Sequence, residues 1–159
     1  MIHQDFWIRE AGPIVEVFSD RLTVRSPGNP VIPPDRFLDQ DRARNERTVE
    51  AMRRLGFCER SGSGIDKVME ALEIHQLPAL EVRDSSSLPG SVPETVVTLF
   101  SPRSFRDMSL EEKVRATYWH SVFCLVQGDR MSNASLRNRF GLPDSAYSQV
   151  SLVIRQAIK

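Results

Sequence analysis

The sequence predicts an α+β protein in which a helix-on-sheet layer is followed by a unit of three helices. Two observations lead to this fold class. The first two thirds contain short β-branched segments, separated by turn residues and by a pair of helical patterns. The last third has apolar residues at helical spacing throughout. The pattern changes near Pro102, so we expect one domain at residues 1–103 and a second at residues 104–159.

Composition is that of a soluble packed chain. Of 159 residues, 40% are hydrophobic and 26% are charged. The formal net charge of zero argues against a globally basic nucleic-acid binder but allows local patches. Residues 1–103 hold 13 basic and 16 acidic residues, whereas residues 104–159 hold 8 basic and 5 acidic residues. No apolar run could span a bilayer and no signal-peptide pattern is present, so we expect a cytoplasmic protein without a membrane partner.

Cysteine and histidine spacing gives no sign of a metal or redox centre. Cys58 and Cys124 are far apart, and none of the three histidines has a second ligand nearby in sequence. We therefore expect reduced thiols, no metal site and no catalytic residue.

Two hairpins are predicted in the first domain. Residues 14–18 and 22–24 form the first one around a turn at residues 19–21, and Ser26-Pro27-Gly28 ends its second strand. Residues 80–83 and 95–100 form the second one and extend the same sheet. Residues 29–47 form a long polar loop, of a length typical of either a functional lid or a disordered segment.

Between the hairpins, residues 44–72 predict a helix, a glycine-rich turn and a second helix. The first helix carries Val49, Met52 and Leu55 on one side and ends at Gly56. The second follows Ser61-Gly62-Ser63-Gly64, and its apolar residues form one face of the helix: Ile65, Val68, Met69 and Leu72.

The glycine-rich turn has two interpretations. Two glycines before a helix leave N–H groups free at its positive end, which suits phosphate oxygens. Alternatively, Gly62 and Gly64 only let the chain turn and the helix dock closely. On either interpretation we expect Gly64 to need a positive φ or a tight packing position.

The third helix of the chain is predicted to start at Ser109, with Glu112 completing a capping box, and to end at Gly128. Its apolar stripe is Val114, Tyr118, Val122 and Leu125. Trp119 and Phe123 either stack on a nucleobase or a partner, or cover the junction between the two halves.

The last thirty residues predict a helix-turn-helix. Ser132 caps a short helix at residues 133–140, Gly141–Asp144 form the turn, and residues 145–158 form a longer helix. With the preceding helix, this has the layout of a winged-helix domain without its wing. The outward residues expected to contact DNA are Ser145, Tyr147, Ser148, Gln149, Ser151, Arg155 and Lys159. The alternative is a plain helical bundle that pairs two copies of the chain.

A family resemblance covers most of residues 3–103. The segments HQDF, DRLTVRSPGNP, RN and LGFCERSGSGIDKVMEAL follow one another in the order seen in the C-terminal region of RecG-related (AlbA/Schlafen-type) transcriptional regulators. The resemblance implies a GHKL-type ATPase fold. The N-box helix that holds magnesium would precede His3, so the resemblance implies a truncated, degenerate nucleotide-binding domain.

The resemblance also implies candidate cofactor-binding residues. The adenine-binding DxGxG element is matched by Ser26-Pro27-Gly28, which lacks the carboxylate acceptor. The GxG element over the phosphates is matched by Gly62, Ser63 and Gly64. ATP and Mg²⁺ are therefore possible cofactors of a full-length protein, and none is expected to be bound by this chain.

Three functions remain open. The first is a transcriptional regulator fragment whose degenerate nucleotide-binding half is coupled to a DNA-binding half. The second is an accessory domain of an ATP-dependent, helicase-related ATPase, although no Gly-Lys dipeptide of a P-loop occurs and no activity is expected in this chain. The third is a protein-interaction scaffold, including a homodimer, without a ligand.

Overall fold

The computed structural model describes residues 3–8, 12–58, 63–84 and 92–158 of an α+β chain. The chain divides into two compact units. The sheet unit comprises residues 1–66 and 81–99, and the helical unit comprises residues 67–80 and 100–159. The units therefore do not follow a linear boundary near residue 103, because the segment 67–80 groups with the C-terminal helices.

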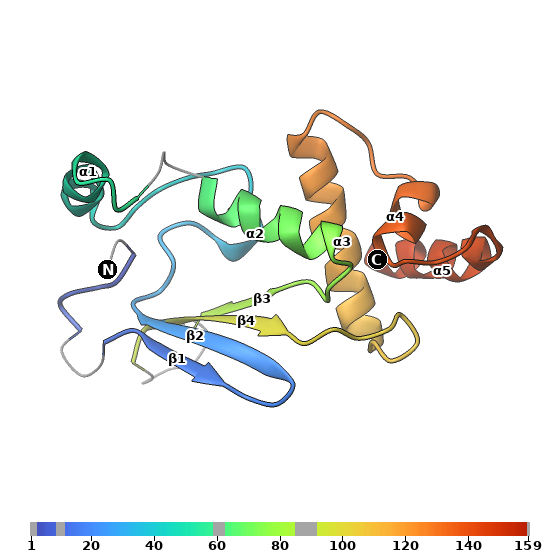
Figure 1. The fold of residues 1–159 in the computed structure, drawn as a ribbon, viewed down its shortest axis with the longest axis horizontal. Coiled ribbons are helices and arrows are strands. Elements are labelled where there is room, and N and C mark those ends of the chain that lie inside the picture. The colour runs from blue at the N-terminus through green and yellow to red at the C-terminus, as the bar shows by residue number, and fades with distance from the viewer. Residues whose placement is uncertain (1–2, 9–11, 59–62, 85–91, 159) are drawn as a thin grey trace. The chain divides into compact units, whose positions relative to one another are not determined.

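The sheet unit contains one four-stranded sheet in the order β1-β2-β4-β3 (Figure 1). Strands β1 (Ile14–Val17) and β2 (Arg21–Pro27) pair antiparallel, as do β3 (Glu81–Asp84) and β4 (Glu94–Phe100). The two predicted antiparallel strand pairs are confirmed, and so is the prediction that they belong to one sheet. Arg25 joins the hairpins, since its Nη2 donates to Glu94 Oε1 at 2.9 Å.

A long connection leads from β2 to α1 (Glu46–Arg54) and contains a 3-10 turn at Pro34–Arg36. Gly56 adopts φ 74° just after α1. Its N–H donates to Arg53 O and that of Phe57 donates to Met52 O, which is the Schellman arrangement. The predicted helix end is confirmed. The predicted apolar face is not a packed one, because α1 has no buried residue and Leu55 is 69% exposed.

The helical unit contains α3 (Leu110–Val126), α4 (Asn133–Arg139), α5 (Tyr147–Ala157) and most of α2 (Ser63–Ile74). Helix α5 packs on both α3 and α4. A 3-10 turn at Asp144–Ala146 leads into α5. Buried apolar residues of these helices and turns are Met69, Leu72, Ala116, Trp119, Leu136, Phe140, Ala146, Val150 and Val153.

Local signals for the C-terminal helices are confirmed. Ser109 and Ser132 each form a capping box, with Glu112 and Ser135 as the reciprocal partners. Gly128 adopts φ 78° at the end of α3.

The predicted apolar stripe of α3 is not the buried side of the helix, and only Val114 and Val122 of its members are partly buried. Tyr118 and Leu125 are exposed, whereas Trp119 and His120 are buried. Hydropathy could not reveal this side of the helix, because the polar His120 is buried beside a carboxylate from α2. Trp119 contacts the Tyr118 ring edge to face and is 5% exposed, so it offers no surface for stacking on a base.

Within the part of the chain that the structure describes, no helix combines the length and apolar character needed to cross a bilayer.

The expected constraint at Gly64 was also wrong. Gly64 lies in the first turn of α2, is exposed, and a Cβ added there would meet nothing within 4 Å. Gly28 is the opposite case, with φ 99° and a Cβ position only 2.7 Å from Asp5 Cβ.

We therefore expect Gly64→Ala to leave the free energy of unfolding unchanged or to raise it by up to about 1 kcal/mol, through helix propensity. Gly28→Ala should lower it by about 1–3 kcal/mol, through backbone strain and the close contact. Urea denaturation of the two variants is the measurement. A larger loss at Gly64 than at Gly28 would contradict this assignment.

Candidate functional site

The motifs of the sheet unit meet at the end of β2. The N–H of Asp5 donates to Pro27 O at 2.9 Å, and Arg44 Nη1 donates to Asp5 Oδ2 at 3.0 Å. Asn45 Nδ2 donates to Gln4 O at 2.8 Å. The HQDF, SPG and RN segments thus form one hydrogen-bonded group, which we call the motif cluster. Sequence reasoning recognised the order of these segments but gave Asp5, Arg44 and Asn45 no role.

Gly28 lies in the motif cluster, and both its N–H and its carbonyl group form hydrogen bonds. Its N–H donates to Pro93 O at 2.8 Å, and its carbonyl accepts from Thr95 Oγ1 at 2.7 Å. Gly28 therefore offers no free N–H to a phosphate. Burial, followed by neighbouring positive charge that includes Arg44, lowers the pKa of His3. A lowered pKa favours the neutral imidazole, so His3 is a weaker cation for an anionic ligand than an ordinary histidine.

The second glycine element lies at the start of α2. Ser63 is the first residue of this helix and Gly64 the second, whereas Gly62 lies outside the described residues. Gly64 is exposed and unconfined, in contrast to Gly28. Nucleotide binding by Ser26, Gly28, Ser63 and Gly64 stays a prediction.

The helix-turn-helix segment has the predicted order of elements. Gly141 adopts φ 64° after α4, and the 3-10 turn then leads into α5. Asn133 Nδ2 donates to Tyr147 O and to Ser151 Oγ, both at 3.0 Å. Arg137 pairs with Asp144 at 2.9 Å. These contacts fix the start of α5 against α4.

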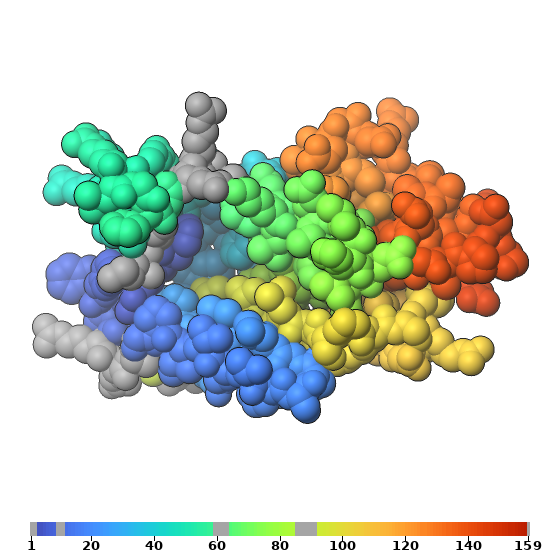
Figure 2. Space-filling model, in the orientation of Figure 1, coloured from blue at the N-terminus to red at the C-terminus, as the bar shows by residue number. Residues whose placement is uncertain are grey.

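The outward face of α5 is where the sequence placed it. Ser145, Tyr147, Ser148, Gln149 and Arg155 are all exposed. Ser151 is half-buried and accepts the hydrogen bond from Asn133, and Lys159 lies outside the described residues. Residues 145–159 contain no aspartate or glutamate. The helices of this segment, orange to red in Figure 2, present side chains at the surface.

A largely buried carboxylate on α2 pairs with side chains of α3 and α4. Glu73 Oε1 accepts from Arg139 Nε at 2.7 Å, and Glu73 Oε2 contacts His120 Nδ1 at 2.8 Å. His120 Nε2 lies 3.1 Å from Ser135 Oγ. Arg139 and His120 are only 3% and 7% exposed. We call Glu73, His120, Ser135 and Arg139 the clasp, because it joins α2, α3 and α4.

The turn after α2 strengthens the clasp. Gln76 adopts a left-handed backbone with φ 52°, which is costly for a residue with a Cβ. Its side-chain Nε2 donates to Asn138 O at the end of α4, at 3.0 Å. Arg139 Nη2 donates to Leu77 O. Gly141 has φ 64°, a left-handed backbone that favours glycine, and a Cβ added there would lie 2.5 Å from the end of the Gln76 side chain and displace it.

The clasp contains an acid, an imidazole and a hydroxyl, as a catalytic triad does, but its hydrogen bonds serve to hold the helices together. Ser135 Oγ accepts from Ser132 N at 2.9 Å and donates to Ser132 O, as its place in the capping box requires. Cys124 Sγ lies 3.6 Å from His120 Nε2, and burial raises the pKa of this thiol. The thiol is therefore protonated at neutral pH and is a poor nucleophile. Among the described residues, no group of His, Cys, Asp and Glu could hold a metal ion.

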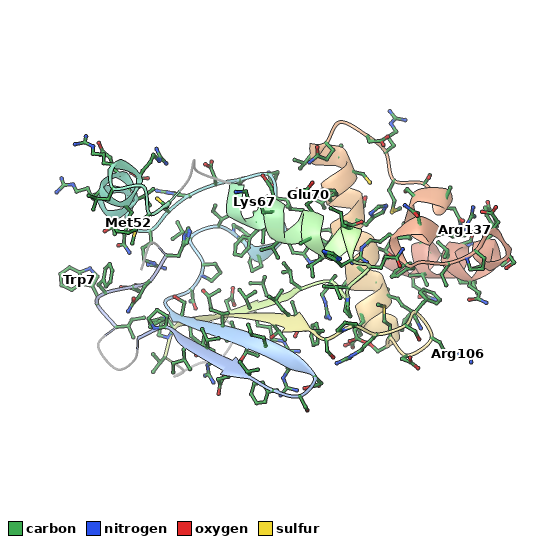
Figure 3. All side chains as sticks on the ribbon, viewed as in Figure 1. Trp7, Met52, Lys67, Glu70, Arg106 and Arg137 are labelled. Atoms are coloured by element: carbon green, nitrogen blue, oxygen red, sulfur yellow. The ribbon has the colours of Figure 1, made fainter. Side chains whose placement is uncertain are left out.

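Glu73→Gln should lower the free energy of unfolding of the helical unit by on the order of 3 kcal/mol. Removing the carboxylate charge leaves the buried Arg139 guanidinium without its counter-ion. Glu70→Gln, on the exposed side of the same helix (Figure 3), is the matched control and should change stability by less than about 0.5 kcal/mol. Thermal and urea melts of both variants are the measurement. Equal stability of the two would show that the clasp contributes little.

One comparison with known proteins gives a match. Residues 10–88, about half of the chain, match a family model described as "Putative ATP-dependent DNA helicase recG C-terminal". The match includes both β1 and β2, helices α1 and α2, and β3. No curated protein and no solved structure matches the chain. The motif order and the family model agree, and residues 10–88 belong to the family of RecG-related C-terminal regions.

Proposed function

We propose that the chain is a regulatory module in which a RecG-related sheet unit without a working nucleotide site is joined to a DNA-binding helix-turn-helix. The observation that carries the proposal is the exposed face of α5. Apart from the exposed Leu152, this face is polar, contains no acidic residue, and is held in place by Asn133 and by the clasp. Such a face fits base edges and phosphates better than an apolar protein surface.

Exposed arginines of the helical unit support binding to a polyanion. Arg106, Arg130 and Arg155 are exposed, and within the described residues none of them forms an ion pair. Figure 3 labels Arg106, in the segment between β4 and α3, and Arg137 on α4. Arg137 is paired with Asp144, so the described cationic side chain of the α5 face is Arg155, while Arg106 and Arg130 lie before and after α3.

The clasp provides a route for regulation. Helix α2 begins at the glycine element and ends at the turn that binds α4. Any ligand or partner that shifts α2 would act on Glu73 and Gln76, and through them on α4 and the face of α5. In this proposal the regulated output is the affinity for DNA, and the chain acts in transcriptional control rather than as an enzyme.

The sheet unit should bind nucleotide weakly or not at all. We expect that Mg-ATP produces no saturable amide shifts at sub-millimolar concentration and no turnover above background. Ser26 supplies no carboxylate for adenine, and the Gly28 N–H is already donated to Pro93. NMR titration is the measurement, with the Gly64 amide as the reporter. Saturable shifts of that amide at micromolar ATP would overturn this expectation.

DNA binding should come mainly from charge. We expect non-specific affinity of about 10⁻⁴–10⁻⁶ M at physiological salt, falling steeply as salt rises because phosphate contacts release counter-ions. Arg155→Ala should weaken binding about equally on all sequences, and its effect should shrink at high salt. Fluorescence anisotropy on a labelled duplex across a salt series is the measurement. Ser145→Ala, on the same surface but without charge, is the matched control for the salt slope.

The absence of binding at low salt would remove the DNA-binding function. The helical unit would then be a protein-interaction module, which sedimentation of the same samples would test by its concentration dependence.

A further inference from the structure

The exposed face of α5 carries one apolar side chain at its centre. Leu152 is 59% exposed. Its four neighbours on the helix surface, three and four residues away in each direction, are Ser148, Gln149, Arg155 and Gln156. All four are exposed and none is acidic. Leu152 is thus a single methyl-bearing side chain surrounded by hydrogen-bonding and cationic groups.

This arrangement does not fit a groove-binding helix of the protein–protein kind. Such helices present apolar anchors at i, i+3 or i+4, and i+7. The other exposed apolar side chains on and just after α5 are Tyr147 and Ile158. Tyr147 lies about 140° from Leu152 around an ideal helix, and Ile158 lies close to the side of Tyr147. The described apolar side chains of this face therefore form no continuous stripe.

The arrangement does fit the major-groove edge of an adenine–thymine pair. Thymine presents a C5-methyl group there, and adenine presents an acceptor at N7 and a donor at N6. A glutamine amide matches the adenine edge with one donor and one acceptor, and an apolar side chain matches the methyl group. Gln149 lies in the first turn of α5 and Leu152 lies one turn later, where recognition helices contact bases.

We propose, on the basis of the DNA-binding function proposed above, that Gln149 and Leu152 are specificity-determining residues for adenine–thymine pairs. Leu152 contacts the thymine methyl group and Gln149 contacts the adenine edge. Arg155, one turn further along, contacts the phosphate backbone and adds affinity without sequence preference.

The test uses three duplexes of about 20 base pairs with identical ends: alternating A·T, the same sequence with uracil in place of thymine, and alternating G·C. Removing the methyl group should weaken binding of the unmodified chain about fourfold, as expected for one apolar carbon withdrawn from a contact. Leu152→Ala should bind the thymine and uracil duplexes equally. Ile158→Ala removes an even more exposed apolar side chain on another side of the helix and should retain the fourfold difference.

The adenine contact is tested with 7-deazaadenine, which lacks the N7 acceptor. The unmodified chain should bind this duplex more weakly than the adenine duplex, whereas Gln149→Ala should bind both equally. All three substituted residues are exposed, so thermal melts should match those of the unmodified chain and exclude misfolding as the cause.

The outcomes separate the two proposals. If the unmodified chain binds no duplex at low salt, the DNA-binding function itself fails. If it binds but does not distinguish thymine from uracil, or if Leu152→Ala still distinguishes them, only the base-reading assignment is overturned. If Leu152→Ala instead abolishes self-association in sedimentation and leaves DNA affinity unchanged, the face is a protein interface and the assignment is wrong.

Discussion

The helical unit depends on one carboxylate. Arg139 is almost fully buried on α4, and a buried guanidinium is strongly destabilising unless it is paired and hydrogen-bonded. Glu73 supplies the counter-ion from α2, and the same carboxylate contacts His120 of α3. Glu73 lies within the segment that belongs to the RecG-related family. That segment therefore contributes a helix to the core behind the helix-turn-helix, which explains why the compact units interleave along the chain.

Features set by local chemistry could be predicted from the sequence. The capping boxes at Ser109 and Ser132, and the helix ends at Gly56 and Gly128, depend on residues within one or two turns of each other. The buried side of α3 could not be predicted in this way. His120 is buried because a carboxylate 47 residues earlier in the chain accepts its hydrogen bond, and no periodicity records a contact of that range.

The candidate site likewise contains some features that local sequence predicts and others that depend on long-range contacts. The exposed set on α5 follows from helical periodicity once Val150 and Val153 are placed inward, and the structure has both buried. The contacts within the motif cluster could not be predicted, although its segments were recognised. The order of the segments along the chain does not reveal that Arg44 pairs with Asp5. Gly28 and Gly64 are both glycines of recognised motifs. The sequence alone does not reveal that an added side chain would meet close neighbours at Gly28 and none at Gly64.

This difference between the two glycine elements bears on how the module could be regulated. At the end of β2, hydrogen bonds to Pro93 and Thr95 occupy the backbone of Gly28, so a ligand would have to break existing contacts to bind there. At the start of α2, Gly64 is exposed and an added side chain would meet no neighbour. The opposite end of that same helix carries Glu73 and leads into the left-handed Gln76. Under the proposed regulatory function, an input at the glycine end would act through α2 on the residues that contact α4. In the proposed module, the glycine-rich start of α2 would thus act through Glu73 and Gln76 on α4, and this effect needs no chemical step.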